Sequence, residues 1–164
     1  GKLPISFPYE VGSHPNYYNQ YDHWHDGKYK DGHKGSDYPF GFGLSYSKFV
    51  YSDIKISKTE FGKDDTVKLT VSVKNESDTD GYETVQLYFR DKVCKMLTPI
   101  RQLIDYKKVF ITAGKEFEVE FNLPIKILGY YNESCKYCVD AGEFVLFVSG
   151  DGKNFKETSI FVIE

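Results

Sequence analysis

From residue 49 onward, apolar and polar residues alternate along most of the chain. The alternation is strict in two runs, Val67-Leu69-Val71-Val73 and Phe117-Val119-Phe121-Leu123. An alternation of period two places the apolar side chains on one face of an extended strand, so each run predicts a half-buried β-strand. Seven such runs are rich in Val, Ile, Phe, Tyr and Thr, and they cover residues 49–57, 66–74, 82–90, 106–111, 116–123, 143–149 and 157–163.

Clusters of turn-forming residues separate these runs. KNESDTDG, TAGK, VDAG and SGDGKN all combine Gly with Asn, Asp or small residues, and such clusters support tight reversals of the backbone. No helical period of useful length is present. Short strands at this spacing predict an all-β fold, a seven-stranded antiparallel sandwich of the immunoglobulin or fibronectin type III kind. An eight-stranded jelly roll is the alternative. Charged residues between the apolar ones indicate that each sheet has one solvated face.

The first 47 residues follow no such period. They contain four of the six prolines, all four histidines and the single Trp. A loop of this length inside a compact domain is usually functional or packed against another part of the protein. We therefore expect a long irregular N-terminal lead-in before the sandwich.

Composition narrows the classes of partner. The chain has 164 residues, enough for one domain with an extension, and a net charge of −3 with no basic stripe, so a nucleic-acid partner is not expected. Apolar runs such as FVLFV are far shorter than the roughly 20 residues of a membrane-spanning helix, so no membrane partner is expected either. The three cysteines are too few for a disulfide scaffold, which favours a cytoplasmic over a secreted location.

Several longer strings resemble one enzyme family. GKLPISFP, YPFGFGLSY, VKNESDTDGYETVQLYFRD, PIRQLIDYKKVFITAGKEFEVEFNL and LGYYNE occur in this order, and together they resemble the C-terminal region of glycoside hydrolase family 3, the β-glucosidase and β-xylosidase family. The resemblance implies a barrel domain that supplies the catalytic Asp nucleophile, an α/β domain that usually supplies the general acid/base, and a fibronectin type III-like domain that follows them. GKLPISFP resembles the end of the α/β domain. The resemblance therefore divides the chain into residues 1–37, the end of that domain plus an interdomain linker, and residues 38–164, the fibronectin type III-like domain.

The resemblance implies an accessory role for this chain. The catalytic residues of the family have no counterpart here, so no residue is expected to be catalytic and no cofactor is expected. The implied partners are the catalytic barrel and the α/β domain of the same enzyme, which the module would stabilise, and a β-linked oligosaccharide if the module edges the substrate cleft. Two alternatives remain open: a free-standing carbohydrate-binding module, or one piece of a β-glycosidase whose catalytic domains lie on another chain or segment.

The segment DYPFGFGLSY resembles the entry of the family's chain into the sandwich. Its rings Tyr38, Phe40, Phe42 and Tyr46 are predicted to pack between domains, and we expect Phe40 or Tyr46 to be buried against the sandwich. The preceding Gly1–Pro8 is expected to be mobile, or packed on a neighbouring molecule, because the resemblance assigns it to another domain.

Other candidate chemistry is weaker. Tyr21 and Trp24 could offer flat faces to a sugar, although packing against other domains is the favoured interpretation of these rings. His23 and His25 are weak candidates for a surface metal site. Cys135 and Cys138 have the spacing of a redox motif, but they lie in a predicted hairpin or strand, which favours structural thiols. The acidic residues of NESDTDG are interpreted as a solvated hairpin tip.

Overall fold

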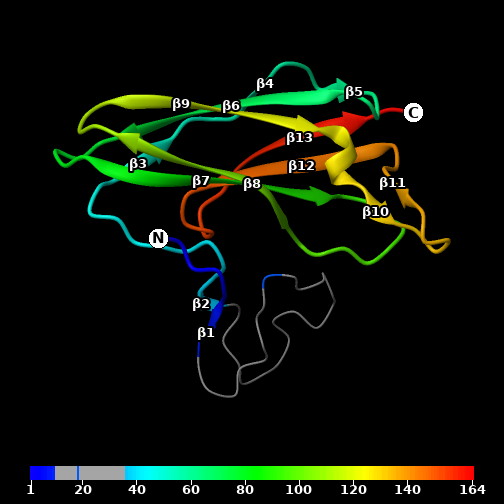
Figure 1. Ribbon diagram of the computed structural model, residues 1–164, viewed down its shortest axis with the longest axis horizontal. Helices are drawn as coiled ribbons and strands as arrows, with labels where there is room; N and C mark the ends of the chain where they lie inside the picture. The colour runs from blue at the N-terminus through cyan, green and yellow to red at the C-terminus, as the bar shows by residue number, and fades with distance from the viewer. Residues whose placement is uncertain (10–17, 19–35) are drawn as a thin grey trace.

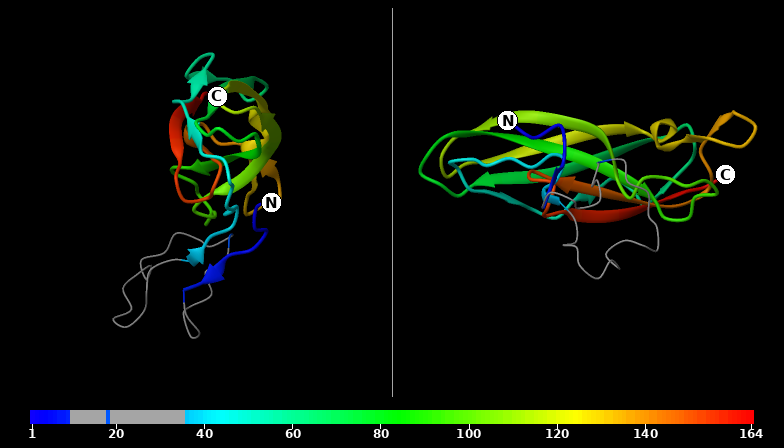
Figure 2. Two further views of the ribbon diagram at one scale, coloured as in Figure 1. Left: turned by 90° about the vertical axis from the view of Figure 1, so that its left-hand side faces the viewer. Right: turned by 90° about the horizontal axis from the view of Figure 1, so that it is seen from below.

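The computed structural model describes residues 1–9, 18 and 36–164. Two β-sheets lie face to face along the long axis of the molecule (Figure 1). The end-on view in Figure 2 shows these two layers, with the first two strands extending away from them. The predicted all-β, fibronectin type III-like sandwich is therefore confirmed. In the described part of the chain, no helix has the length and apolar character needed to cross a membrane.

The larger sheet has five strands in the order β5-β13-β12-β7-β8. β7 (Gly81–Asp91), β8 (Gln102–Ile111), β12 (Gly142–Ser149) and β13 (Lys156–Val162) pair antiparallel. The short edge strand β5 (Glu60–Phe61) pairs parallel with β13. β7 and β12 lie next to each other in the interior of this sheet, and each has a paired strand on both sides.

The smaller sheet is built around β6 (Thr66–Asn75). β9 (Glu116–Pro124) pairs with one edge of β6, and β3 (Phe49–Tyr51) and β4 (Lys55–Ile56) pair with the other. The run at 49–57, predicted as one strand, is thus two strands. At the break, Ser52 N donates to Ser72 O at 2.9 Å and Ser72 N donates to Ser52 Oγ at 3.0 Å. A side-chain oxygen replaces a backbone carbonyl there and interrupts the ladder.

The connection between β6 and β7 passes from one sheet to the other. The NESDTDG segment is therefore an inter-sheet corner, and its interpretation as a hairpin tip is wrong. Asn75, which is completely buried, holds the corner by donating Nδ2 hydrogen bonds to Thr79 O at 2.8 Å and to Ile111 O at 3.0 Å. The SGDGKN segment, in contrast, does join two paired strands, β12 and β13.

Five short strands, β5 among them, and one helical turn lie outside the seven predicted runs. β1 (Phe7–Pro8) pairs with β2 (Ser36–Tyr38) inside the lead-in. The 3-10 helix η1 (Ile125–Leu128) follows β9 and buries Ile125 and Leu128 at one end of the sandwich. Next, β10 (Tyr130–Tyr131) and β11 (Tyr137–Cys138) form a small hairpin. These pieces are too short to produce a period in the sequence.

The core lies between the two sheets. It is made of the inward-facing apolar residues of both sheets, with completely buried side chains that include Phe61, Val67, Leu69, Val73, Val85, Leu87, Phe121, Leu146 and Ile160. The predicted alternation holds along β6 and from Val119 to Leu123 of β9. Phe117, predicted to lie on the inward side of β9, is exposed. The five-stranded sheet departs from the prediction of one solvated face per sheet, since Val85 to Phe89 of β7 are all buried.

Candidate functional site

The N-terminal segment is docked on the sandwich, and the expectation that Gly1–Pro8 is mobile is wrong. Leu3 N donates to Phe42 O at 2.8 Å, and Gly41 N donates to Leu3 O at 2.8 Å. Phe40 N donates to Ser6 Oγ at 3.0 Å. Together with the β1–β2 pairing, these bonds join the two described pieces of the lead-in, residues 1–9 and 36–47, into one layer.

This layer covers the outward face of β7. Gln86 and Tyr88 point away from the core, yet each is only 3% exposed. Gln86 Nε2 donates to Gly41 O at 3.0 Å, and the Tyr88 hydroxyl donates to Gln86 Oε1 at 2.6 Å. Gly41 has φ +81°, and a Cβ atom there would lie 2.2 Å from Gln86 Oε1. Glycine at position 41 is therefore what allows the lead-in backbone to approach the sheet this closely.

A buried ion pair fixes the start of the chain. Lys2 Nζ lies 3.0 Å from Glu83 Oε1, and the side chains of Lys2 and Glu83 are 17% and 5% exposed. Glu83 continues the inward phase of Val85 and Leu87, so a carboxylate stands at the end of the core. Burial, followed by the negative charge of Glu83, raises the pKa of the neighbouring Tyr51. Lys2 supplies the positive charge that such a buried carboxylate requires.

The rings of DYPFGFGLSY have different environments. Phe40 stacks on Tyr18 with centroids 4.1 Å apart, and the Tyr18 hydroxyl accepts a hydrogen bond from Leu103 N at the start of β8. Tyr38 and Phe42 lie 5.0 Å apart, and Lys153 Nζ is 4.8 Å from the Phe42 centroid. Phe40 is half-buried and packs within the lead-in, so it meets the expected burial only in part. Tyr46 is completely exposed, so the burial expected of one of these two rings rests on Phe40 alone.

A cavity of about 540 Å³ adjoins this docked segment. Rings from the lead-in, from β3 and from the β12–β13 turn line it, together with the Glu83 carboxylate. The turn itself is held by Asp151, whose Oδ1 accepts backbone hydrogen bonds from Lys153 at 2.9 Å and Asn154 at 2.8 Å. Gly152 in this turn has φ +66°, and a Cβ atom on it would lie 2.4 Å from Phe40 O. The turn and the lead-in are thus in close backbone contact.

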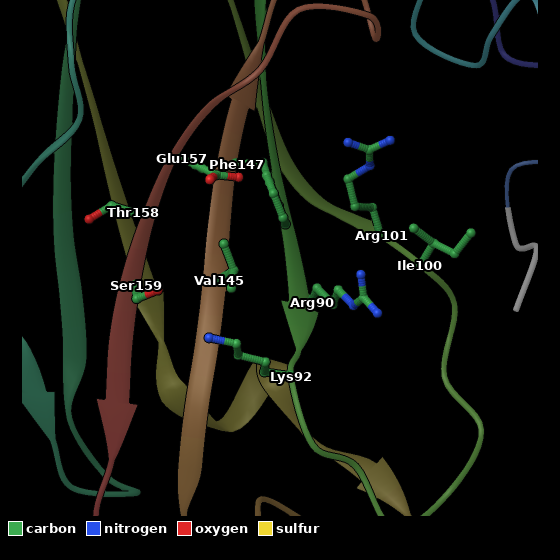
Figure 3. A pocket seen from close by; sticks show the side chains of 9 residues that line it. All are labelled: Arg90, Lys92, Ile100, Arg101, Val145, Phe147, Glu157, Thr158 and Ser159. Atoms are coloured by element: carbon green, nitrogen blue, oxygen red, sulfur yellow. The ribbon is translucent and has the colours of Figure 1, made fainter. Parts of the chain in front are cut away.

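A second hollow, of about 650 Å³, lies on the outer face of the five-stranded sheet (Figure 3). Strands β7, β12 and β13 form its floor, and the connection that leads into β8 forms one wall. Arg101 in this wall stacks over Phe155, with its Cζ 4.0 Å from the ring centroid, and lies 5.6 Å from the centroid of Phe147. The hollow is lined by Arg90, Lys92, Ile100, Arg101, Val145, Phe147, Glu157, Thr158 and Ser159.

Several residues singled out from sequence lie outside the described residues. These are Tyr21 and Trp24, predicted to contact sugar, and His23 and His25, the weak metal candidates. Within residues 1–9, 18 and 36–164, no three His, Cys, Asp or Glu side chains come together in a way that could hold a metal ion. Cys138 lies in β11 and Cys135 in the turn before it, so the predicted hairpin setting of this pair is confirmed.

Sequence reasoning missed the most constrained residues of the lead-in contact. Gln86 and Tyr88 occupy the polar phase of a strand, and that phase ordinarily faces water. One signal was available: YETVQLYFR alternates a core phase of Val85, Leu87 and Phe89 with a second phase that contains a large ring at position 88. Bulky residues in both phases indicate a strand covered on both faces.

Comparison with known proteins agrees with this architecture. The family described as Fibronectin type III-like domain matches residues 83–151. A periplasmic β-glucosidase of Salmonella typhimurium is 33% identical over 97% of this chain and 22% of its own length. A β-xylosidase of Formosa agariphila is 33% identical over 93% of this chain and 22% of its own length.

Solved structures give the same result. A β-glucosidase of Erythrobacter marinus superposes with a TM-score of 0.90 at 34% identity, covering 99% of this chain and 22% of that one. A β-glucosidase of intestinal bacteria that is involved in saponin metabolism has a TM-score of 0.93 at 30% identity, with the same coverage. The chain spans about a fifth of the length of these relatives. It belongs to glycoside hydrolase family 3, in which it corresponds to the C-terminal region with the fibronectin type III-like domain.

Proposed function

We propose that this chain stabilises the catalytic domains of a β-glucosidase- or β-xylosidase-type enzyme, and that the lead-in sets the position of the sandwich relative to them. The observation that carries the proposal is the burial of Gln86 and Tyr88, two outward-facing residues, under Phe40 and Gly41. A sheet face buried by its own lead-in gives a fixed geometry to the segment that connects the sandwich to what precedes it.

The proposed partners are the barrel and α/β domains expected from the family. The division at residue 37/38 belongs to this proposal, as does the role of the module at the edge of the substrate cleft. Tyr38 and Tyr46 are 43% and 102% exposed, and Leu44 between them is 86% exposed. Such apolar exposure in one short segment is typical of a surface that is covered in the complete protein.

Exposed aromatic rings also lie on the outer face of β7 and β8. The alternative, a carbohydrate-binding module, would require rings on such a face to form a flat surface for a sugar. Tyr82 and Phe110 are 62% and 49% exposed, with centroids 5.0 Å apart. Their planes are inclined by 59°. A flat sugar face stacks on coplanar rings, so this tilt supports the accessory role over the carbohydrate-binding role.

The direct test of the proposal compares Gly41→Ala with Gly114→Ala in the full-length enzyme. Both glycines have positive φ, but only Gly41 has neighbours that a methyl group would meet. We expect Gly41→Ala to lower the temperature of thermal inactivation by several degrees more than Gly114→Ala, with kcat at low temperature within about twofold of the parent. Equal inactivation temperatures for the two variants would overturn the proposal.

Two measurements on the 164-residue chain test the alternatives. The proposal expects no hydrolysis of aryl β-glucosides or β-xylosides above background, because the paired carboxyls of a retaining glycosidase are expected elsewhere in the enzyme. It also expects no saturable heat on titration with cello- or xylo-oligosaccharides at millimolar concentration. Saturable binding that is lost in Trp24→Ala would favour the carbohydrate-binding module instead.

A further inference from the structure

The lead-in layer, residues 1–9 and 36–47, rests on the sandwich without contributing to its core. Among these residues only Gly41 and Ser47 are buried, and none of them belongs to the apolar cluster between the two sheets. Segments that bury few apolar side chains open at a lower free-energy cost than the core beside them. An opening of this layer is therefore expected to cost less than unfolding of the sandwich.

The layer is bonded within itself. Leu3 N donates to Phe42 O at 2.8 Å, and Gly41 N donates to Leu3 O at 2.8 Å. β1 and β2 pair inside the same layer. Since these bonds join residues 1–9 to residues 36–47 and not to the sheet, the two pieces should leave the sheet together.

The surface beneath the layer carries polar groups. Gln86 Nε2 donates to Gly41 O at 3.0 Å, and the Tyr88 hydroxyl donates to Gln86 Oε1 at 2.6 Å. When the layer leaves, water can take the place of Gly41 O as the acceptor. The opening thus uncovers an amide and a hydroxyl on the outer face of β7, while the apolar core stays covered.

One carboxylate holds the layer through an ion pair. Glu83 Oε1 lies 3.0 Å from Lys2 Nζ, and the Glu83 side chain is buried. Tyr51 faces this carboxylate from β3, and burial, followed by the charge of Glu83, raises the pKa of Tyr51. Lys156 lines the same cavity but pairs with Asp53 at 2.9 Å. Among the described residues, Lys2 is therefore the cation that compensates Glu83, and protonation of Glu83 would remove the attraction.

A second carboxylate shapes the turn between β12 and β13. Asp151 Oδ1 accepts hydrogen bonds from the Lys153 and Asn154 backbones, and its Oδ2 accepts one from Asn154 Nδ2 at 2.7 Å. Burial acts to raise the pKa of Asp151, but the hydrogen bonds outweigh it and the net pKa is lowered. Burial, with the charge of Asp151 among the further causes, raises the pKa of Tyr88 under the layer. Protonation of Asp151 would weaken these charge-assisted bonds.

This turn touches the layer directly. A Cβ atom on Gly152 would lie 2.4 Å from Phe40 O, and Lys153 Nζ lies 4.8 Å from the Phe42 ring centroid. A turn that loses its Asp151 bonds would no longer hold Gly152 and Lys153 against the layer. The two ends of the contact, at Lys2 and at the turn, thus both depend on an ionised carboxylate.

We propose that the lead-in layer is a pH-sensitive strap, which lies closed on the five-stranded sheet while Glu83 and Asp151 are ionised and opens as one unit when both are protonated, with the sandwich still folded. Carboxyl groups in water titrate near pH 4. Since the closed state needs both carboxylates ionised, the open state binds more protons, so closure is favoured above about pH 4 and is lost as pH falls below it. The inference does not rest on the proposed function, because all of these contacts lie within this chain.

The experiment follows the 164-residue chain by NMR between pH 7 and pH 2. The side-chain amide of Gln86 reports closure, because it donates to the layer, and the backbone amides of Leu69 and Val71 in β6 report the folded sandwich. We expect the Gln86 signal to reach the position of a solvated amide at least about one pH unit above the loss of the β6 signals. The Leu3 and Phe42 amides should change with Gln86. Loss of all signals at the same pH, or separate transitions for Leu3 and Phe42, would overturn the inference.

Variants identify the two carboxylates. Glu83→Gln keeps the shape of the side chain without its charge, and it should raise the open population at pH 7 at least about tenfold. Its control is Glu76→Gln, which removes an exposed pair with Lys48 at 2.9 Å and should leave the Gln86 signal unchanged. Equal open populations in these two variants, with the β6 signals intact, would contradict the proposal.

A further variant covers the case in which Glu83→Gln folds poorly. Asp151→Asn imitates one of the two protonations, so it should move the opening to higher pH while the β6 signals are lost at the same pH as in the parent chain. An opening at unchanged pH in Asp151→Asn would show that the turn does not hold the layer, and the proposal would fail.

Discussion

The outer faces of the two sheets differ more than their inner faces do. On the four-stranded sheet, β6 and β9 present Thr, Ser, Lys, Glu and Asn to solvent, with exposed pairs such as Lys68–Glu120 at 2.8 Å. On the five-stranded sheet, β7 and β12 present Gln86, Tyr88 and Phe147, all buried. The outer face of the four-stranded sheet is therefore exposed to solvent, whereas the outer face of the five-stranded sheet is covered by a further layer of protein.

This difference identifies where the molecule is specialised. Exposed charged pairs, as on the four-stranded sheet, contribute little to stability and tolerate substitution. Buried hydrogen-bonded polar groups, as on the five-stranded sheet, destabilise the protein when they lose their partners. The lead-in, the β12–β13 turn and Arg101 all lie over the outer face of the five-stranded sheet. Substitutions on this face should therefore also disturb the segments that cover it.

The largest effect is expected from placing a charge on each face. Gln86→Lys removes the hydrogen bonds to Gly41 and Tyr88 and buries an ammonium, so we expect a loss of about 3 kcal/mol in the free energy of unfolding. The loss is limited because the lead-in can detach and admit water. Thr70→Lys, on the outer face of β6 opposite Glu120, should change stability by less than about 0.5 kcal/mol. Urea denaturation measures both, and similar losses would mean that the two faces are equivalent.

The next comparison separates two costs of replacing a glycine: the left-handed backbone conformation and the close approach of a neighbouring segment. Gly152 and Gly114 have φ of +66° and +68°, but a Cβ on Gly152 would lie 2.4 Å from Phe40 O while one on Gly114 would meet nothing within 4 Å. We expect Gly114→Ala to cost about 1 kcal/mol for the left-handed conformation alone, and Gly152→Ala to cost about 1 kcal/mol more. Faster amide hydrogen exchange at Gly41 and Phe42 in Gly152→Ala, but not in Gly114→Ala, would locate the extra loss in the lead-in.

A third comparison concerns a buried and an exposed lysine. Lys2→Met leaves Glu83 without its counter-charge, and we expect a loss of about 2 kcal/mol, reduced from a fully buried case because the chain end can move. Lys48→Met removes the exposed pair with Glu76, 2.9 Å apart, and should cost less than about 1 kcal/mol. Thermal unfolding of both variants is the measurement. If Lys2→Met were as mild as Lys48→Met, the docking of the first residues would contribute little to stability.

The sequence is informative about the two faces to different degrees. Strands with a solvated outer face, such as β6 and β9, can be predicted from the sequence, because burial of one face alone produces an apolar residue at every second position. Gln86 and Lys2 were not assigned roles, because each acts through a partner that is more than 40 residues away in the sequence. A period of two carries no information on such contacts. The family resemblance predicted the architecture, but it carried no information on Arg101. The contact of Arg101 with Phe155 depends on how the connection before β8 folds.

The smallest effect is the acid sensitivity of the turn beneath the lead-in. Burial alone would raise the pKa of Asp151, but hydrogen bonds from the Asn154 and Lys153 backbones and from the Asn154 and Ser149 side chains outweigh it, and the net pKa is lowered from 3.8. Near pH 3 to 4 the unfolded chain therefore binds more protons than the folded one, so stability is fully present above about pH 4 and is lost as pH falls through the folded pKa. Asp151→Asn should make the free energy of unfolding depend less steeply on pH in this range.

The control variant is Glu120→Gln on the exposed outer face of the other sheet, where the hydrogen bond from Lys68 lowers the pKa of a solvated carboxylate. Denaturant titrations between pH 2 and 5 should show a larger change of slope for Asp151→Asn, together with earlier release of the lead-in. A larger change for Glu120→Gln would reverse the assignment of the two faces.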